Sequence, residues 1–223
     1  MVTVESVLGL DNRAISESAE FKCPLHDQVC GPLDKLREAA RGAGLDLGVV
    51  SGYRSFERQL AIWNGKAQGL RPVLDSQGTP LDLSALSDRE KVFAILRWSA
   101  LPGASRHHWG TDVDVYDPSA VTEDYSIQLT VSETCDGGAF TKLHAWLDEQ
   151  LSSGESDFYR PYDTDRGGVA PEPWHLSYRP LSSQYMGLLS LEALRGCVEN
   201  QSLLLKETVL DNLEEIYTRF VVV

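Results

Sequence analysis

Apolar side chains recur at helical spacing in several segments of the chain. In residues 32–41, Leu33, Leu36, Ala39 and Ala40 fall on one face of a helix, and the segment opens on a proline and stops at Gly-Ala-Gly. The same spacing predicts further helices with one buried face. They cover residues 56–68, 87–101 and 140–152, and about 182–198 and 201–220.

Polar residues mark where two of these helices begin. Ser55 is a suitable N-cap for the helix after it, because its hydroxyl can accept a hydrogen bond from a free backbone amide. Ser87 and Glu90 have the spacing of a capping box. Pro102 cannot continue a helix, so the helix that starts after Ser87 should end near Leu101.

Alternation of polar and apolar residues predicts strands over residues 45–50, 111–116 and 174–178. In the second strand, Asp112 and Asp114 point to one face, and the valines between and after them point to the other. Glycine, proline and polar residues predict loops between these elements. The loops cover residues 69–83, 117–137 and 157–170, the last with room for a hairpin.

These elements predict an α+β fold, with a small antiparallel sheet flanked by helices. Residues 1–30 lack sustained periodicity and form an N-terminal arm with at most short elements. Residues 31–180 form the central domain, a size that can bury one core. Residues 181–223 form a helical C-terminal extension packed on that domain.

Composition and charge exclude several classes of protein. Apolar residues make up 42% of the chain and charged residues 24%, which is typical of a globular protein. The net charge of -13 argues against a nucleic-acid partner, because binding phosphates requires clustered lysine and arginine. No apolar run is long enough to span a membrane. No signal peptide is visible as written, so we expect a cytoplasmic location, with the periplasm or cell envelope as the alternative.

The four cysteines carry no C-x-x-C pair and so give no strong zinc or redox signature. Cys23, His26 and Cys30 could in principle supply three metal ligands. Closed structural zinc sites normally use four, so we favour reduced thiols or a local Cys23–Cys30 disulfide.

Two short stretches carry the candidate chemistry, Ser105 to Asp114 and Glu172 to His175. A catalytic zinc site uses three nitrogen or oxygen ligands and leaves one position for water. His107, Asp114 and His175 can supply those ligands. Glu172, three residues before His175, is a candidate general base for the water.

These stretches resemble the motifs of the LAS metallopeptidases, a family of zinc enzymes that includes D-alanyl-D-alanine carboxypeptidases and dipeptidases. The resemblance spans roughly residues 33 to 180 and implies that the small sheet of a zinc peptidase domain carries the site. The family's S-x-H-x-x-G-x-x-x-D pattern is met by Ser105, His107, Gly110 and Asp114, and its E-x-W-H pattern is met further along the chain by Glu172, Trp174 and His175. Its Y-R-S pattern is met upstream of both by Tyr53, Arg54 and Ser55.

The resemblance implies one zinc ion per chain, bound by His107, Asp114 and His175. It implies that Glu172 acts as base and then as proton donor to the leaving amine. Arg54 would anchor the substrate or stabilise the oxyanion, a role that suits its fixed fork of donors. Ser105 and Gln59 would help to hold the terminal groups of the peptide.

The implied function is hydrolysis of peptide bonds next to D-amino acids in peptidoglycan stem peptides. The proline in Glu172-Pro173-Trp174-His175 resembles the carboxypeptidase branch, so we expect a D-alanyl-D-alanine carboxypeptidase whose partner is a peptidoglycan-derived peptide. An L-alanyl-D-glutamate endopeptidase is the alternative with the same chemistry. A catalytically silent, zinc-containing binding module is the alternative of another class, and Glu172 argues against it because a binding module needs no base.

Asp112 departs from the family pattern, which usually has a small residue at this position. The chain therefore carries a second carboxylate on the same strand face as Asp114. Asp112 could orient a ligand histidine or compete for the metal. The spacing from His107 favours Asp114 as the ligand.

Overall fold

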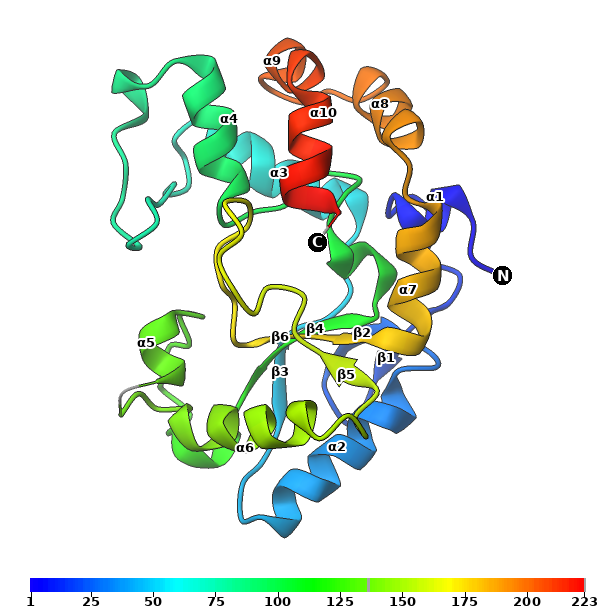
Figure 1. Ribbon diagram of the computed structural model, residues 1–223, viewed down its shortest axis with the longest axis vertical. Helices are drawn as coiled ribbons and strands as arrows, with labels where there is room; N and C mark the ends of the chain where they lie inside the picture. The colour runs from blue at the N-terminus through cyan, green and yellow to red at the C-terminus, as the bar shows by residue number, and fades with distance from the viewer. Residues whose placement is uncertain (136, 223) are drawn as a thin grey trace.

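The computed structural model describes residues 1–135 and 137–222, and its architecture is α+β, as predicted (Figure 1). The helices that pack around the sheet and above it are α1 (Val4–Val7), α2 (Cys30–Gly42), α3 (Phe56–Ala67), α4 (Asp88–Leu96), α5 (Val131–Thr134), α6 (Thr141–Ser152), α7 (Arg179–Leu188), α8 (Leu191–Glu199), α9 (Lys206–Asp211) and α10 (Leu213–Ile216). The strands are β1 (Ile15–Ser18), β2 (Cys23–His26), β3 (Gly48–Ser51), β4 (Asp112–Tyr116), β5 (Phe158–Tyr159) and β6 (His175–Tyr178).

A four-stranded antiparallel sheet with the order β3-β4-β6-β5 forms the centre of the molecule. Its register pairs Asp114 with Ser51 on one side and with His175 on the other. Asp112 pairs with Ser177 in the same way. Because side chains alternate across a strand, these polar residues share one face of the sheet.

The opposite face of the sheet is apolar and packs on α2 and α6, which lie beneath it in Figure 1. Val113, Val115 and Leu176 point into this layer and are at most 1% exposed. Leu33 from α2 and Leu143 from α6 are fully buried against them. Burial contributes about 1.5–3 kcal/mol for each such side chain, so this layer holds the sheet in place.

A second core lies above the sheet, where α3 and α4 pack against the C-terminal helices (Figure 1). Trp63, Ile95, Leu194 and Ile216 are all fully buried in it. The Trp63 Nε1 group also donates a hydrogen bond to the Leu204 carbonyl oxygen, at 3.0 Å. The segment after residue 180 therefore shares its core with helices of the central domain.

Several boundaries differ from the predictions. The helix predicted over 182–198 is two helices, because the chain leaves helical geometry at Leu189 and Ser190 then caps α8 by accepting from the Ala193 amide. The helix predicted over 201–220 is divided between α9, α10 and a π-helical turn at Tyr217–Val221. The N-terminal arm contains only short elements before α2, as predicted: α1 and the β1–β2 hairpin.

Helix α4 ends at Leu96, before the predicted position near Leu101. Side chains just beyond it are held by loops: the Trp98 indole donates to the Asp75 carbonyl oxygen, at 2.9 Å, and the Arg97 guanidinium donates to the Gly168 carbonyl oxygen, at 2.8 Å. These tertiary bonds fix the side chains that follow the helix. The capping boundaries at Ser55 and Ser87 are confirmed.

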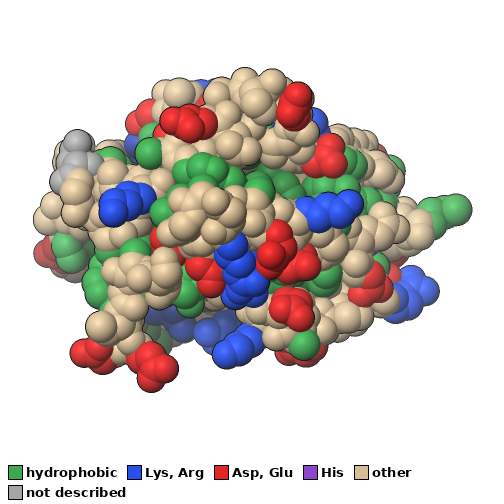
Figure 2. Space-filling model, turned by 90° about the horizontal axis from the view of Figure 1, so that it is seen from below, with side chains coloured by type: hydrophobic (Ala, Val, Ile, Leu, Met, Phe, Trp, Pro, Cys, Tyr) green, Lys and Arg blue, Asp and Glu red, His purple; other side chains and the backbone are tan. Residues whose placement is uncertain are grey.

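Within residues 1–135 and 137–222, no helix combines the length and apolarity needed to cross a membrane. Figure 2 shows the end of the molecule that carries α2 and α6, where acidic and basic side chains are interspersed rather than separated by sign.

Candidate metal and substrate site

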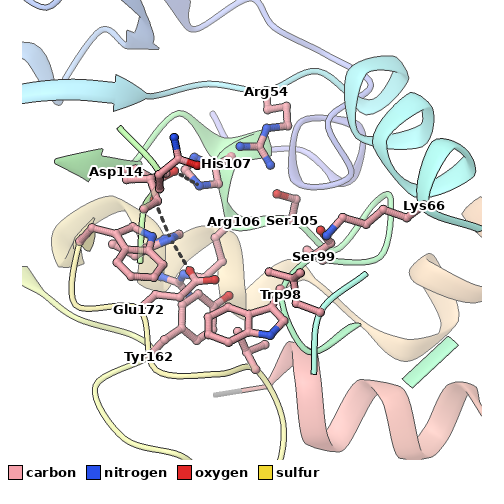
Figure 3. Close-up of a pocket in the computed structure, with 17 residues that line it drawn as sticks. Arg54, Lys66, Trp98, Ser99, Ser105, Arg106, His107, Asp114, Tyr162 and Glu172 are labelled. Atoms are coloured by element: carbon pink, nitrogen blue, oxygen red, sulfur yellow. Dashed lines mark ion pairs between the residues drawn. The ribbon is translucent and has the colours of Figure 1, made fainter. Parts of the chain in front are cut away.

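A cavity of about 280 Å³ opens over the polar face of the sheet (Figure 3). The predicted residues Arg54, Ser105, His107, Asp114, Glu172 and His175 all line it. They come from segments far apart in the chain, namely the end of β3, the turn before β4, β4 itself and the start of β6. The fold therefore brings the two candidate stretches and the arginine together.

The three predicted metal ligands meet at one point of this cavity. His107 lies on a 3₁₀ turn, η2 (Arg106–Trp109), while Asp114 and His175 are paired residues of β4 and β6. One ligand atom from each residue lies within 4.8 Å of the others. The His107 Nε2 to Asp114 Oδ2 distance is 3.4 Å, and the His175 Nδ1 to Asp114 Oδ1 distance is also 3.4 Å.

The second nitrogen of each histidine is already engaged. His107 Nδ1 lies 2.8 Å from the Gly52 carbonyl oxygen, to which it donates, and this leaves Nε2 with a lone pair facing the site. His175 Nε2 lies 3.0 Å from Asp112 Oδ1, so Nδ1 faces the site in the same way. Such outer partners fix the tautomer and orientation of metal-binding histidines.

Two atoms of the cluster are buried and lack a hydrogen-bond partner among the described residues. They are Asp114 Oδ1 and His175 Nδ1, and both face the shared point. Buried polar atoms normally have a partner, because an unpaired one costs free energy. A divalent cation with a preference for imidazole and carboxylate, such as zinc, fits this donor set.

The charges around His175 also favour a cation here. Burial alone would lower the pKa of His175, but the Asp112 and Glu172 carboxylates that contact it raise the pKa to about 10. Burial disfavours the charged form of Asp114, yet the neighbouring His107 and His175 hold its pKa below the ordinary value. A metal ion would take the place of the proton that this cluster otherwise attracts.

The turn that delivers His107 depends on Gly110. Gly110 adopts a φ of +63°, in the left-handed region, where it ends η2. A Cβ atom there would lie 2.6 Å from the Ile15 Cδ1 atom and 2.8 Å from the His26 backbone nitrogen. The Gly110 carbonyl oxygen accepts a hydrogen bond from that same nitrogen, so the β1–β2 hairpin is pressed against the turn.

Asp112 lies beneath the metal cluster, fully buried, and both of its oxygens are engaged. Oδ1 accepts from the Arg106 Nε group at 2.7 Å and contacts His175 Nε2, while Oδ2 accepts from the hydroxyls of Thr111 at 2.6 Å and Ser177 at 3.2 Å. Burial disfavours its charge, but Arg106 holds the pKa of Asp112 well below the usual range. Of the two roles left open by the sequence, this geometry favours orienting His175 over binding the metal.

Glu172 lies on the other side of His175, at the mouth of the cluster. Its Oε2 atom is 3.3 Å from His175 Nδ1, and its side chain is 14% exposed. The backbone on both sides is held: the Glu172 amide donates to the Tyr162 carbonyl oxygen, and Arg160 Nε donates to the Pro173 carbonyl oxygen at 2.6 Å. This carboxylate is therefore fixed beside the metal point and open to the cavity.

Arg54 follows β3, and its guanidinium points into the cavity (Figure 3). It donates to Gln59 Oε1 and to Ser51 Oγ, each at 3.0 Å. Burial lowers the pKa of Arg54, while Asp114 and Glu172 oppose that shift. Both hydrogen-bond partners are neutral, so the positive charge remains available to a ligand.

Gln59 departs from its predicted role. Its side chain is fully buried and does not line the cavity. Its amide nitrogen donates to the Ala100 carbonyl oxygen at 2.7 Å, and its amide oxygen holds Arg54. With both polar ends used, Gln59 is placed to position Arg54 rather than to touch a peptide.

Several residues that line the cavity were missed by sequence reasoning. Lys66 follows Gln59 by seven residues, two helical turns along the same face of α3, and this spacing could have identified it. Gln128, Leu129 and Tyr162 come from segments predicted only as loops. Nothing in the local pattern places them at the site.

Comparison with protein families matches residues 22–181 to VanY, described as D-alanyl-D-alanine carboxypeptidase. The match covers well over half of the 223-residue chain. The chain belongs to the VanY family. The resemblance to the carboxypeptidase branch of the LAS metallopeptidases is thereby confirmed, and this VanY-family protein is a metallopeptidase.

Among curated relatives, an uncharacterised protein of Haemophilus influenzae is 35% identical over 124 residues, which are 55% of this chain and 93% of that protein. A D-alanyl-D-alanine carboxypeptidase of Enterococcus faecalis is 28% identical over 149 residues, which are 66% of this chain. The match spans 45% of the Enterococcus faecalis protein.

Two solved structures share the VanY fold with this chain. VanYB in complex with D-alanine-D-alanine is 24% identical, with a TM-score of 0.52 over 82% of this chain and 87% of the other. A variant of the vancomycin resistance D,D-pentapeptidase VanY in complex with Zn(II) is 25% identical, with a TM-score of 0.51 over 87% of this chain and 88% of the other. The Zn(II) complex supports zinc as the metal that suits the His-Asp-His cluster.

Proposed function

We propose that this protein removes the terminal D-alanine from peptidoglycan stem peptides, with one zinc ion per chain held by His107, Asp114 and His175. The observation that carries the proposal is the pair of buried, unpartnered atoms Asp114 Oδ1 and His175 Nδ1, which face the cavity beside Glu172. The names of the relatives support the substrate class, since one is called a D-alanyl-D-alanine carboxypeptidase and another is seen with D-alanine-D-alanine.

Glu172 is the proton carrier of the proposed reaction. When bound, zinc would supply a Lewis acid that polarises the scissile carbonyl and makes a water molecule more acidic. Glu172 takes a proton from the attacking water as the new C–O bond forms. It then gives a proton to the amine of the departing D-alanine as the C–N bond breaks, so the carboxylate is regenerated.

Arg54 stabilises the negative charge that develops on the carbonyl oxygen. Its guanidinium enters the cavity already oriented by Gln59 and Ser51, so it need not reorganise during the reaction. Asp112 acts one step away: it keeps His175 in the tautomer and orientation that turn Nδ1 toward the metal point. Ser105, which is buried and lines the cavity, offers a neutral hydroxyl to the bound peptide.

The proposal is tested with Glu172→Gln, which keeps the size of the side chain and removes the base. The zinc-loaded parent protein and the variant are incubated with a pentapeptide that ends in D-alanyl-D-alanine, and released D-alanine is measured by mass spectrometry. We expect the rate to fall about 10²–10⁴-fold, the usual contribution of a general acid–base group. Elemental analysis should still find zinc in the variant.

The matched control is Glu149→Gln, which removes an exposed glutamate of α6 and should leave release unchanged. Full activity in Glu172→Gln contradicts the mechanism. Cleavage of the stem peptide at an internal L-alanyl-D-glutamate bond would instead identify an endopeptidase. Absence of cleavage of any stem peptide by the parent protein would identify a binding module.

A further inference from the structure

Lys66 lies in the last turn of α3 and extends its side chain into the cavity, toward Ser99 and Ser105 (Figure 3). It is not a metal ligand, and the reaction proposed above does not use it. Lys66 Nζ forms no hydrogen bond or ion pair with any residue in the described ranges 1–135 and 137–222. A cation thus enters the substrate cavity without a protein partner.

This placement is costly for a lysine unless an anion joins it. Burial lowers the pKa of Lys66 to about 8, with a further contribution from Arg71, because the ammonium loses contact with water. Lys66 is partly buried, and a charge that has lost part of its water is stabilised by an opposite charge nearby. Arg106, another cation at the cavity, is paired with Asp112, whereas no carboxylate of residues 1–135 and 137–222 forms an ion pair with Lys66, and Glu172 acts on it only from a distance.

The charge balance of the cavity points to the missing anion. The protein side brings the carboxylates of Asp114 and Glu172, and the chain as a whole carries a net charge of -13. In the proposed function the bound zinc ion would offset these two carboxylates, so a further cation in the lining is free to pair with an anionic group of the ligand. Gln59 and Ser51 hold Arg54, and Asp112 pairs with Arg106, so among the described residues that line the cavity Lys66 is the cation without a hydrogen-bond or ion-pair partner.

We propose that Lys66, a residue outside the motifs of the site, binds the C-terminal carboxylate of the peptide. The inference rests on the proposed function, because it assigns one end of the same substrate. The hydroxyls of Ser99 and Ser105, which line the cavity beside Lys66, add neutral donors to this carboxylate subsite. The departing residue then lies toward α3, and the rest of the peptide extends away from it.

The experiment compares two ligands that differ at one group. One is a stem pentapeptide with a free terminal carboxylate, and the other is the same peptide with a C-terminal amide. Binding is measured by calorimetry in the zinc-loaded Glu172→Gln protein, where turnover does not interfere. The second substitution is Lys66→Met, and Lys66→Arg is the variant that preserves the charge. Lys35→Met, which replaces an exposed lysine of α2, is the matched control.

We expect Lys66→Met to weaken binding of the free acid roughly tenfold to a hundredfold, as for loss of a charge-assisted hydrogen bond. Binding of the amide should not change, Lys66→Arg should retain most of the affinity for the acid, and Lys35→Met should match its parent. With Glu172 restored, Lys66→Met should raise KM for the acid and leave kcat nearly unchanged. Thermal unfolding of each variant checks that the fold persists.

Each of the other outcomes contradicts a specific part of the proposal. Equal weakening of acid and amide would mean that Lys66 binds a side-chain carboxylate of the stem peptide, and no change in either would mean that it binds no carboxylate. Equal cleavage of acid and amide by the parent protein would leave the peptidase proposal standing and overturn the role of Lys66. If neither ligand is cleaved but the acid is bound through Lys66, the hydrolysis proposal fails and the carboxylate subsite stands.

Discussion

The two sides of the cavity are built in opposite ways. The sheet floor, formed by Arg106, His107, Asp112, Asp114 and His175, is a network in which the supporting polar atoms already have partners. Its two unpartnered atoms both face the metal point. On the α3 side, which we call the wall, Arg54 and Lys66 line the cavity and present positive charge. Arg54 is held only by the neutral side chains of Gln59 and Ser51. The floor is thus suited to a cation and the wall to an anion, and in the proposed reaction these two sides would have separate tasks, activating the bond and holding the substrate.

Removing a ligand from the floor should have the largest effect. We expect Asp114→Ala to lose zinc and with it all hydrolysis, because the variant lacks one of three protein ligands. Asp112→Ala should retain more zinc than Asp114→Ala, because all three ligands remain. Elemental analysis after gel filtration compares the two variants, and zinc retained by Asp114→Ala but lost by Asp112→Ala would reverse the assignment of the ligand.

Removing the arginine from the wall should reduce catalysis without removing the metal. We expect Arg54→Met to lower kcat about 10²–10³-fold, as for loss of one oxyanion donor. Arg54→Lys should restore little, because a lysine lacks the planar fork that Gln59 and Ser51 orient. Arg58→Met, at an exposed position of α3, is the matched control for kinetic assays. A loss confined to KM would show that Arg54 only binds substrate.

Weakening the support beneath the floor should cost stability and metal affinity. In Asp112→Asn, Arg106 keeps a buried charge without its carboxylate, so we expect the free energy of unfolding to fall by about 3–5 kcal/mol. Zinc affinity should fall about 10–100-fold, since His175 loses its outer partner. Urea unfolding and zinc titration measure the two effects. A double variant with Arg106→Met should recover part of the stability but not the zinc affinity; recovery of both would contradict the orienting role.

The smallest effect should be a pH dependence of KM that arises from the wall. Burial lowers the pKa of Lys66 to about 8, and the charges that act on it come from Arg54, Arg71 and Glu172. Lysine is positive below its pKa, so the free protein loses this charge as the pH rises through about 8, and KM for the free acid should then rise. Lys66→Arg should keep KM level over the same range. Steady-state kinetics from pH 7 upward provide the measurement, and a KM that rises equally in both proteins would exclude Lys66 as the cause.

The sequence predicted the floor better than the wall, and the reason is physical. Alternation in β4 placed Asp112 and Asp114 on one face, and short motifs at the strand ends supplied both histidines. The pairing of Asp112 with Arg106 and Ser177 depends on strand register, which the motifs do not state. The predicted α+β class is confirmed. It could be predicted because the periodicity of the long helices and of the strands can be recognised within short segments of the sequence.

Parts of the wall and the loops depend on contacts that local patterns do not encode. Leu129 has a φ of +53°, unusual for a side chain of this kind. The Glu133 carboxylate accepts hydrogen bonds from the Gln128 and Thr130 amides, each at 3.1 Å, and so holds the backbone around Leu129. Gln128 and Leu129, which were predicted to lie in an irregular insertion, thus form an ordered edge of the cavity. The residues sit at the site because of that tertiary arrangement, not because of a motif.

The bonds between α3 and the segment after residue 181 have an evolutionary consequence. Trp63 and Asn64 of α3 are tied to the Ser202 and Leu204 backbone, which lies beyond the end of the VanY match. The helix that carries Lys66 therefore rests partly on chain outside the segment shared with the family. Changes in the C-terminal helices are therefore expected to reach the α3 wall through these bonds. If Lys66 binds the peptide as proposed, sequence variation in this segment would be a route to altered peptide selectivity.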